Sequence, residues 1–163
     1  MNQLMSIINL ADEPEHIPTL ATWHDSEWAH LNPGRSLEQR IQSMQAYLGG
    51  NLIPSTFIYK HQDRLAGSAA ITASDMDNKP QWTPWLASVF VEPSFRNQGI
   101  GSQLVRHVMT QALRAGITRL YLFTPDRAAF YQKLGWTILL EDVYRGHAVT
   151  VMRADLFHAT NQT

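Results

Sequence analysis

A glycine-bearing segment, Arg96 to Gly101 (RNQGIG), stands between a short apolar run and a long amphipathic pattern. The run predicts a buried strand, and the pattern predicts a helix that begins at the segment. The first amides of a helix are unpaired and carry partial positive charge, so they form a natural binding site for phosphate. Gly99 and Gly101 lack a Cβ and would let a diphosphate approach the backbone, and Arg96 adds a permanent cation. The segment is therefore a candidate diphosphate site.

The spacing excludes two other phosphate-binding motifs. A Walker A loop requires Gly-Lys-Ser/Thr after its glycines, whereas residues 100–102 are Ile-Gly-Ser and supply no lysine. A Rossmann fingerprint requires a third glycine at the position that Leu104 occupies. An ordinary strand-to-helix turn would also contain glycines, so the interpretation depends on the neighbouring features.

The elements around this loop predict one mixed α/β domain over residues 1–163, with a core of about residues 5–155 and a short C-terminal tail. A first helix is expected with Asp12 as N-cap and Pro14 in its first turn, and Pro18 falls early enough to be tolerated or to reset the start. Ser36 is expected to cap a second helix over residues 37–48, with Gln39 at a capping-box position. Further helices are expected at 100–115 and 127–134. Strands are expected at residues 5–10, 55–60, 65–73, 86–91, 119–123, 137–144 and 147–153, with Gly67 at a bulge.

The composition narrows the class of protein. The chain contains no cysteine, which excludes disulfides and thiolate metal sites, and its histidines lack ligand-like spacing, so no metal is expected. The net charge of −1 indicates no basic face for nucleic acid. The start lacks a signal-peptide pattern, and no apolar run reaches membrane-spanning length. A cytoplasmic protein without membrane association is the expectation.

Two segments resemble the GNAT superfamily of N-acetyltransferases. Arg96 to Gly101 matches the family's Arg/Gln-x-x-Gly-x-Gly/Ala loop, and Phe130 to Trp136 (FYQKLGW) resembles its FYxKLGF/W segment. The element order is similar from Met5 to Arg153, so the resemblance covers almost the whole chain. It implies a single-domain GNAT-like fold, with a mixed sheet of about six to seven strands splayed at the cofactor strand and about four flanking helices. It also implies acetyl-CoA as cosubstrate.

The resemblance assigns cofactor contacts position by position. Backbone amides of residues 98–102 would hold the pyrophosphate, and Val89 and Val91 would pair with the pantetheine arm. The strand at 120–123 would form the other side of the cleft. The expected cofactor-binding residues are Val89, Phe90, Val91, Arg96, Asn97, Gln98, Gly99, Ile100, Gly101, Ser102, Phe123, Thr124, Phe130, Tyr131 and Lys133.

Acetyl transfer by direct attack through a tetrahedral intermediate needs a base, an oxyanion donor and an acid. A backbone amide near Val89 is the expected donor, and Tyr131, placed by the resemblance near the thioester sulfur, is the expected acid. Asp75 and Glu92 are the candidate bases. Asp77 and Glu27 are further candidates, an ordered water is an alternative, and a plain surface role stays open for each carboxylate.

The amine acceptor is expected among the first two helices and the loop at 75–84. The aromatic residues there are Trp23, His24, Trp28, Trp82 and Trp85, and core packing is the competing explanation for Trp23 and Trp28. Asp75 favours a cationic acceptor, a primary amine of a small molecule or a peptide. The alternative function is a non-catalytic acyl-CoA-binding or sensing module. Dimers are common among proteins that the chain resembles, so a homodimer is a further expectation.

Overall fold

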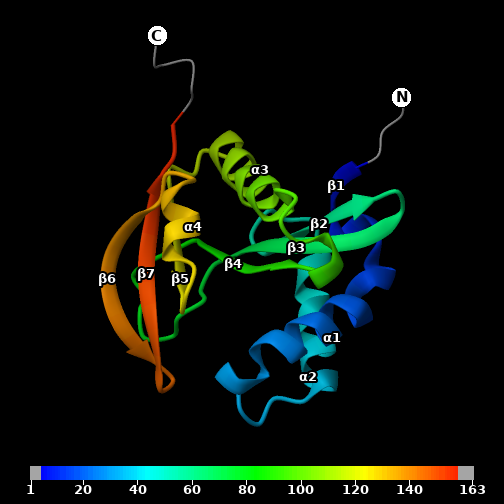
Figure 1. Ribbon diagram of the computed structural model, residues 1–163, viewed down its shortest axis with the longest axis horizontal. Coiled ribbons are helices and arrows are strands. Elements are labelled where there is room, and N and C mark those ends of the chain that lie inside the picture. Colours follow the sequence, from blue (N-terminus) through cyan, green and yellow to red (C-terminus); the bar gives the residue numbers. More distant parts are fainter. Residues whose placement is uncertain (1–4, 158–163) are drawn as a thin grey trace.

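The computed structural model describes residues 5–157, in which seven strands form one sheet with helices on both faces (Figure 1). The strands follow the order β1-β2-β3-β4-β5-β7-β6. Neighbouring strands are antiparallel except β4 and β5, which are parallel. Their bounds are β1 (Met5–Asn9), β2 (Ser55–His61), β3 (Arg64–Thr72), β4 (Trp85–Val91), β5 (Arg119–Thr124), β6 (Thr137–Tyr144) and β7 (His147–Asp155). The predicted mixed sheet is confirmed, and most of the expected tail lies outside the described residues.

The described residues contain four α-helices, α1 (Ile17–Trp28), α2 (Leu37–Ser43), α3 (Ile100–Arg114) and α4 (Ala128–Gln132). Helix α3 covers one face of the sheet, and α1 and α2 lie on the other (Figure 1). Alternation along β2 explains how both faces are buried. Phe57 and Tyr59 belong to the core under α3, whereas Ile58 packs with Leu20 of α1 and Met44.

The first helix begins later than its sequence predicts. Asn9 accepts a hydrogen bond from the Ala11 amide at 2.8 Å and caps a 3₁₀ turn, Leu10–Asp12, which a second turn, Pro14–His16, follows. The predicted start at Asp12 is wrong, and the alternative that Pro18 resets the start is confirmed. Pro18 has no N–H to donate to residue 14, so it fits only the first turn of a helix. Helix α1 accordingly begins at Ile17.

The second helix is capped as predicted. Ser36 Oγ accepts from the Gln39 amide at 3.1 Å, and Gln39 Oε1 accepts from the Ser36 amide at 2.8 Å, which completes the capping box. The α-helix ends at Ser43 and continues as a 3₁₀ helix, Met44–Leu48. The predicted span is therefore helical, but its last turns are wound more tightly.

The sheet opens where β4 meets β5. Among the described residues, the two strands pair at Trp85 and Tyr121. Farther along β4 the ladder with β3 shifts, so that Ser68 faces Phe90 while Ala70 faces Ala87. Ser88, at this bulge, has a positive φ of 53°. A bulge bends its strand, and this one accounts for the predicted splay.

Gly67 allows β3 to approach β4 closely beside the bulge. A Cβ at Gly67 would lie 2.7 Å from the carbonyl oxygen of Phe90, which is closer than any real carbon–oxygen contact. The register of β2 and β3 shifts one residue earlier, where Ala66 is the unpaired residue. The predicted bulge thus lies at Ala66, next to Gly67. Gly67 itself is needed because only a residue without a Cβ allows β3 to lie this close to β4.

Candidate functional site

A cleft of about 960 Å³ extends from the N-terminus of α3, along the gap between β4 and β5, to the ends of α1 and α2. Most of the expected cofactor-binding residues line it, whereas Gln98 and Lys133 do not. The lining members of that set are Val89, Phe90, Val91, Arg96, Asn97, Gly99, Ile100, Gly101, Ser102, Phe123, Thr124, Phe130 and Tyr131. One continuous cavity therefore joins the glycine loop to the aromatic segment that follows α3.

The glycine loop is shaped to present backbone amides. Gly99 is the N-cap of α3 in the left-handed conformation, with φ at 80°, and no side chain of the described chain caps the helix. Arg96 Nε donates to the Val91 carbonyl at 2.8 Å, and its guanidinium lies 5.5 Å from the centroid of the Phe90 ring. The Arg96 side chain thus fastens the loop to the end of β4. The Val91 carbonyl, predicted to pair with pantetheine, accepts this bond in the structure.

Tyr131 lies on the wall of the cleft and is 8% exposed. Its ring packs edge-on against Phe130 and Trp136. Burial raises the pKa of the Tyr131 hydroxyl to about 12. The group is therefore protonated at neutral pH, which is the form in which a hydroxyl donates a hydrogen bond or a proton.

Asp75 lines the other end of the same cleft. Burial of the carboxylate in the cleft wall raises its pKa to about 7, and the positive charge of Arg145 opposes part of this increase. A carboxylate with a pKa near neutrality can take up a proton and give it back at working pH, as a general base must. Of the candidate bases, Asp75 has the environment that suits the role, and Glu27 also lines the cleft.

A buried polar chain supports the bulge of β4. His24 Nε2 lies 3.0 Å from Ser68 Oγ, and Ser68 Oγ donates to the Ser88 carbonyl at 3.1 Å. Because the single hydroxyl proton of Ser68 goes to Ser88, His24 Nε2 must carry a proton and act as the donor. Burial, and secondarily the charge of Arg40, lowers the pKa of His24 to about 3, so the imidazole stays neutral. In the sequence, His24 stands out only as one of the aromatic residues of the acceptor region. No sequence pattern indicates its hydrogen bond with Ser68, which lies 44 residues away.

Arg145, in the turn between β6 and β7, joins three segments at the acceptor end of the cleft. One guanidinium nitrogen donates to Asn32 in the connection from α1 to α2, and another lies 3.4 Å from Asp77 in the loop after β3. Asp77, a candidate base, is thereby bound to Arg145 and does not line the cleft.

The structure places three of the predicted acceptor tryptophans outside the cleft wall. Trp85 is fully buried, and its indole N–H donates to the Trp82 carbonyl at 2.7 Å. Trp82 stacks on Tyr121 with centroids 5.2 Å apart, and Trp23 packs against Phe90. Trp85 belongs to the core because β4 begins there and turns the side chain into the sheet face opposite α3, where the half-buried Trp82 packs with it. The half-buried Trp23 packs instead against the core cluster under α1. Trp28 does line the cleft, as does His24.

Glu92, the other candidate base, also lies outside the cleft wall. Its Oε1 accepts from the amide of Ser94 at 3.0 Å and from the Ser94 hydroxyl, which caps the 3₁₀ turn Pro93–Phe95. The carboxylate thus performs an ordinary turn-capping role, the alternative that the sequence left open.

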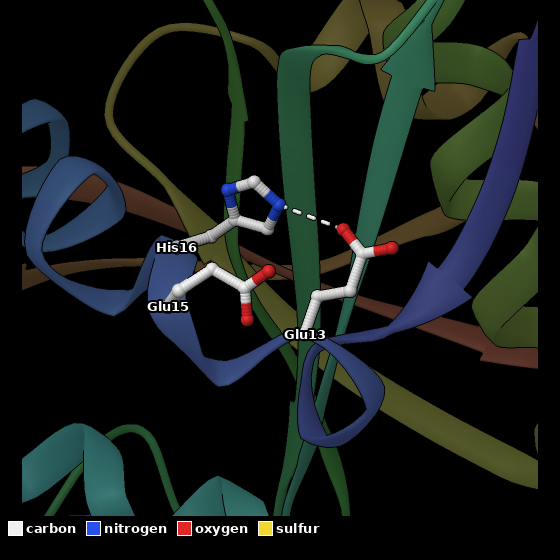
Figure 2. A group of neighbouring side chains, drawn as sticks. All are labelled: Glu13, Glu15 and His16. Atoms are coloured by element: carbon white, nitrogen blue, oxygen red, sulfur yellow. Dashed lines mark hydrogen bonds and ion pairs between the residues drawn. The ribbon is translucent and has the colours of Figure 1, made fainter.

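A cluster of titratable groups lies away from the cleft, at the start of α1 (Figure 2). Glu13 Oε1 accepts hydrogen bonds from His16 Nε2 and from Lys60 Nζ, each at 2.8 Å, and Glu15 lies beside them. These two contacts lower the pKa of Glu13. Since Lys60 already neutralises Glu13, we assign this cluster to the anchoring of α1 on β2.

No helix within residues 5–157 is both long and apolar enough to cross a membrane.

Comparison with known proteins finds N-acetyltransferases among the proteins similar to this chain. The chain is 32% identical over 76 residues to "Uncharacterized N-acetyltransferase ycf52-like" of Prochlorococcus marinus, a match that covers 46% of the chain and 39% of that relative. The chain thus spans about two fifths of the length of this curated relative.

Solved structures share the fold over nearly the whole chain. One is yncA of Salmonella typhimurium, solved with its cofactor acetyl-CoA, with a TM-score of 0.72, 16% identity and coverage of 96% of this chain and 97% of that one. Another is an aminoglycoside 6'-acetyltransferase type Ii, with a TM-score of 0.71, 18% identity and coverage of 96% and 99%. The acetyltransferase (GNAT) family matches residues 14–136, which include the glycine loop and Tyr131. The chain belongs to the acetyltransferase (GNAT) family, as its sequence predicted.

Proposed function

We propose that the chain transfers the acetyl group of acetyl-CoA to a primary amine of a small molecule or a peptide. The observation that carries this proposal is the continuous cleft from the uncapped start of α3 to Asp75, with Tyr131 on its wall. One end offers backbone amides for a diphosphate, and the other offers a carboxylate of raised pKa for an amine. The cofactor and the acceptor would therefore bind in one cavity.

The cofactor would bind along the loop and the open edge of β4. The amides of Gly99 to Ser102 would hold the pyrophosphate, and the guanidinium of Arg96 would stand beside it. The pantetheine arm would follow Val89 to Val91 in the gap that the bulge opens, as an added strand pairs with a sheet edge. Acetyl-CoA supplies the activated acetyl thioester, and the chain contributes the placement of its carbonyl group.

Asp75 would act as the general base. The attacking nitrogen forms a bond to the carbonyl carbon and loses a proton to the Asp75 carboxylate, and the bond from carbon to sulfur then breaks. With a pKa of about 7, Asp75 is about half ionised at neutral pH and can accept this proton.

The oxyanion and the leaving sulfur would be stabilised by separate donors. The bulge takes Ser88 and Val89 out of the regular ladder, and both line the cleft, which supports a backbone amide near Val89 as the oxyanion donor. The Tyr131 hydroxyl would donate to the sulfur. Because its pKa of about 12 exceeds that of an ordinary thiol, about 8.5, it would stabilise the thiolate mainly by hydrogen bonding.

Release of free CoA thiol in the presence of amines tests the proposal. We expect turnover with at least one amine of a panel of amino acids, polyamines, aminoglycosides and peptides. Tight CoA binding without thiol release on the whole panel would contradict the proposal and support the non-catalytic acyl-CoA-binding module. The homodimer and the cytoplasmic location stay predictions.

A further inference from the structure

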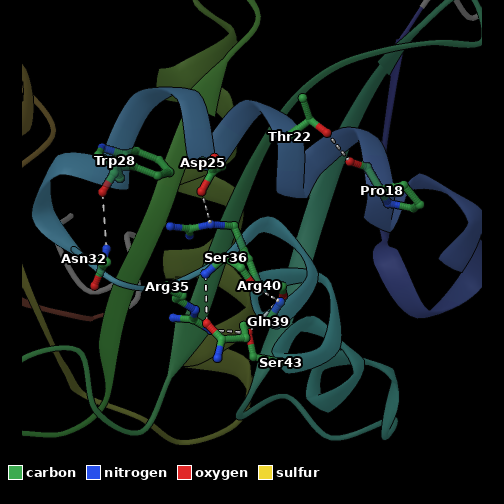
Figure 3. A network of polar contacts seen from close by, with 10 residues as sticks. All are labelled: Pro18, Thr22, Asp25, Trp28, Asn32, Arg35, Ser36, Gln39, Arg40 and Ser43. Carbon is green, nitrogen blue, oxygen red and sulfur yellow. Dashed lines mark hydrogen bonds and ion pairs between the residues drawn. The ribbon is translucent and has the colours of Figure 1, made fainter.

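A buried arginine lines the acceptor end of the cleft without a full set of partners. Arg40 of α2 is 9% exposed, and its Nε and Nη2 atoms have no hydrogen-bond partner among the described residues. Its side chain rises from α2 toward α1, where Asp25 is the neighbouring carboxylate (Figure 3). Burying a charged group without hydrogen bonds is strongly unfavourable, so a small shift of this side chain toward an anion in the cleft would gain hydrogen bonds that the described residues do not supply.

The neighbouring charges do not satisfy Arg40. Asp25 Oδ1 lies 3.7 Å from Nε, beyond hydrogen-bond length, and the Asp25 side chain is 32% exposed to solvent. A second cation, Arg35, also lines the cleft. Burial lowers the pKa of Arg40, and the charge of Arg35 lowers it further. Asp25 is therefore only a partial counter-ion for Arg40, and Arg35 adds a second positive charge at the same end of the cleft.

This cationic site lies next to the reacting groups. The charge of Arg40 acts on His24, whose hydrogen-bond chain ends at the Ser88 carbonyl in the bulge of β4. Asp75 lines the same end of the cleft. Arg40 is therefore available, in the same cleft, to a second and anionic group of a molecule whose amine lies beside Asp75.

We propose that the acceptor is a primary amine that also carries a carboxylate, which Arg40 binds with the assistance of Arg35. This inference rests on the proposed acetyltransferase function. The planar guanidinium matches a carboxylate with two parallel hydrogen bonds. A phosphomonoester with nearly two charges suits the site less well, because Glu27 and Asp75 line the same cavity.

The carboxylate can be the main-chain group of a free amino acid or an acidic side chain at the start of a peptide. Two substrate series distinguish these sources in the thiol-release assay with acetyl-CoA and the full chain. The first compares free L-amino acids with their carboxamides. The second compares the peptide amides Asp-Ala-Ala-Ala and Glu-Ala-Ala-Ala with their Asn and Gln counterparts. Phosphoethanolamine, compared with ethanolamine, probes the phosphate alternative.

In one of the two series we expect the acid to have a kcat/KM at least about tenfold higher than that of its amide. Hydrogen bonds between charged groups contribute enough free energy for a difference of this size. Equal values in both series, or a preference for phosphoethanolamine, would overturn the carboxylate assignment while leaving acetyl transfer intact. Failure of every amine to release thiol would contradict the proposed function, and with it this inference.

Variants of the chain test whether Arg40 causes the preference for the acid over the amide acceptor. In Arg40→Gln we expect the KM for the acid acceptor to rise about 10-fold to 100-fold, while the KM for acetyl-CoA and for the amide acceptor stays unchanged. Arg35→Gln, at an exposed position, should shift the same KM less and does not endanger the fold. Arg106→Gln, exposed on α3 away from the cleft, is the matched control. Equal effects of Arg40→Gln and Arg35→Gln on the acid and the amide would refute the assignment.

Discussion

The two ends of the cleft are built in different ways. At the cofactor end, the expected pyrophosphate contacts come from one short segment, residues 96–102, through backbone amides and the left-handed conformation of Gly99. At the acceptor end, single side chains converge from four distant elements. They are Trp28 of α1, Arg40 of α2, Asp75 of the loop after β3 and Arg145 of the turn between β6 and β7.

The way each end is built decides whether a short sequence motif can predict it. A backbone site depends on where a helix starts and on glycines that permit it, so it can be found from a short motif. A site of converging side chains can change its ligand with single substitutions and leaves no local pattern. Variants at the cofactor end should therefore alter acetyl-CoA binding alone, and variants at the acceptor end should alter acceptor kinetics alone.

The largest expected effect is on cofactor binding. Gly101→Glu places a carboxylate among the amides at the start of α3, and Gly99→Glu adds strain at a φ of 80°. We expect each variant to weaken CoA binding by at least about 100-fold, measured by calorimetry. Gln98→Glu, which adds the same charge outside the cleft wall, should bind CoA far better. Wild-type affinity in a folded Gly101→Glu variant would remove the loop from the cofactor site.

A smaller effect is expected at the base. Asp75→Asn should lower kcat by about 10²-fold to 10⁴-fold with an unchanged KM for acetyl-CoA, because the amide cannot accept the proton. The wild-type rate should fall as the pH drops below about 7, since protonation of Asp75 removes the base. The variant should lack this pH dependence. Asp77→Asn is the control two residues away, and equal losses in both variants would argue against Asp75 as the base.

Tyr131→Phe should have a more moderate effect. We expect kcat to fall by about 10-fold, in keeping with the loss of one hydrogen bond to a charged sulfur, while the ring keeps its packing. Calorimetry should find CoA affinity nearly intact. Tyr59→Phe, in the core under α3, controls for the loss of a buried phenol hydroxyl. An unchanged rate in Tyr131→Phe would remove Tyr131 as the donor.

The smallest expected effect is on stability. The folded pKa of Asp75, about 7, lies above its ordinary value of 3.8, so burial favours the neutral form. This contribution to stability is complete below about pH 4 and is lost as the pH rises through 7. Asp75→Asn avoids the loss, so at pH 8 it should melt about 2–4 °C above the wild type, with a smaller difference at pH 5. Thermal unfolding monitored by circular dichroism measures this, and a constant difference would contradict the raised pKa.

The parts of the fold that depend on neighbouring residues could be predicted from the sequence. The capping box of Ser36 and Gln39, the glycine loop and the seven strands follow from short-range patterns. The start of α1 was not decided by the sequence, because Pro14 and Pro18 each fit the first turn of a helix and only the structure shows that α1 begins at Ile17. Trp85 was assigned to the acceptor pocket because nothing in the sequence indicates that the loop after β3 covers it.

Only part of the proposed acceptor site could be predicted from the sequence. Asp75 was named as a candidate, but its raised pKa depends on a cleft wall assembled from remote segments. Arg40 lies on a helix whose one other charged residue, Glu38, is exposed, so its periodic position did not distinguish it from a surface arginine. Ser68 and His24 meet only because β3 passes beneath α1. These contacts are set by tertiary packing and not by spacing along the chain.

The bridge of Arg145 to Asn32 and Asp77 has a consequence for the speed of substrate exchange. Its ion pair with Asp77 joins two exposed side chains, and such pairs contribute only about 0–1 kcal/mol. Loops held this weakly open and close in nanoseconds to microseconds, whereas typical enzymes complete about 1–10³ cycles per second. Opening of the bridge is therefore too fast to limit turnover. A dependence of kcat on solvent viscosity would have to arise from departure of a product held deeper in the cleft.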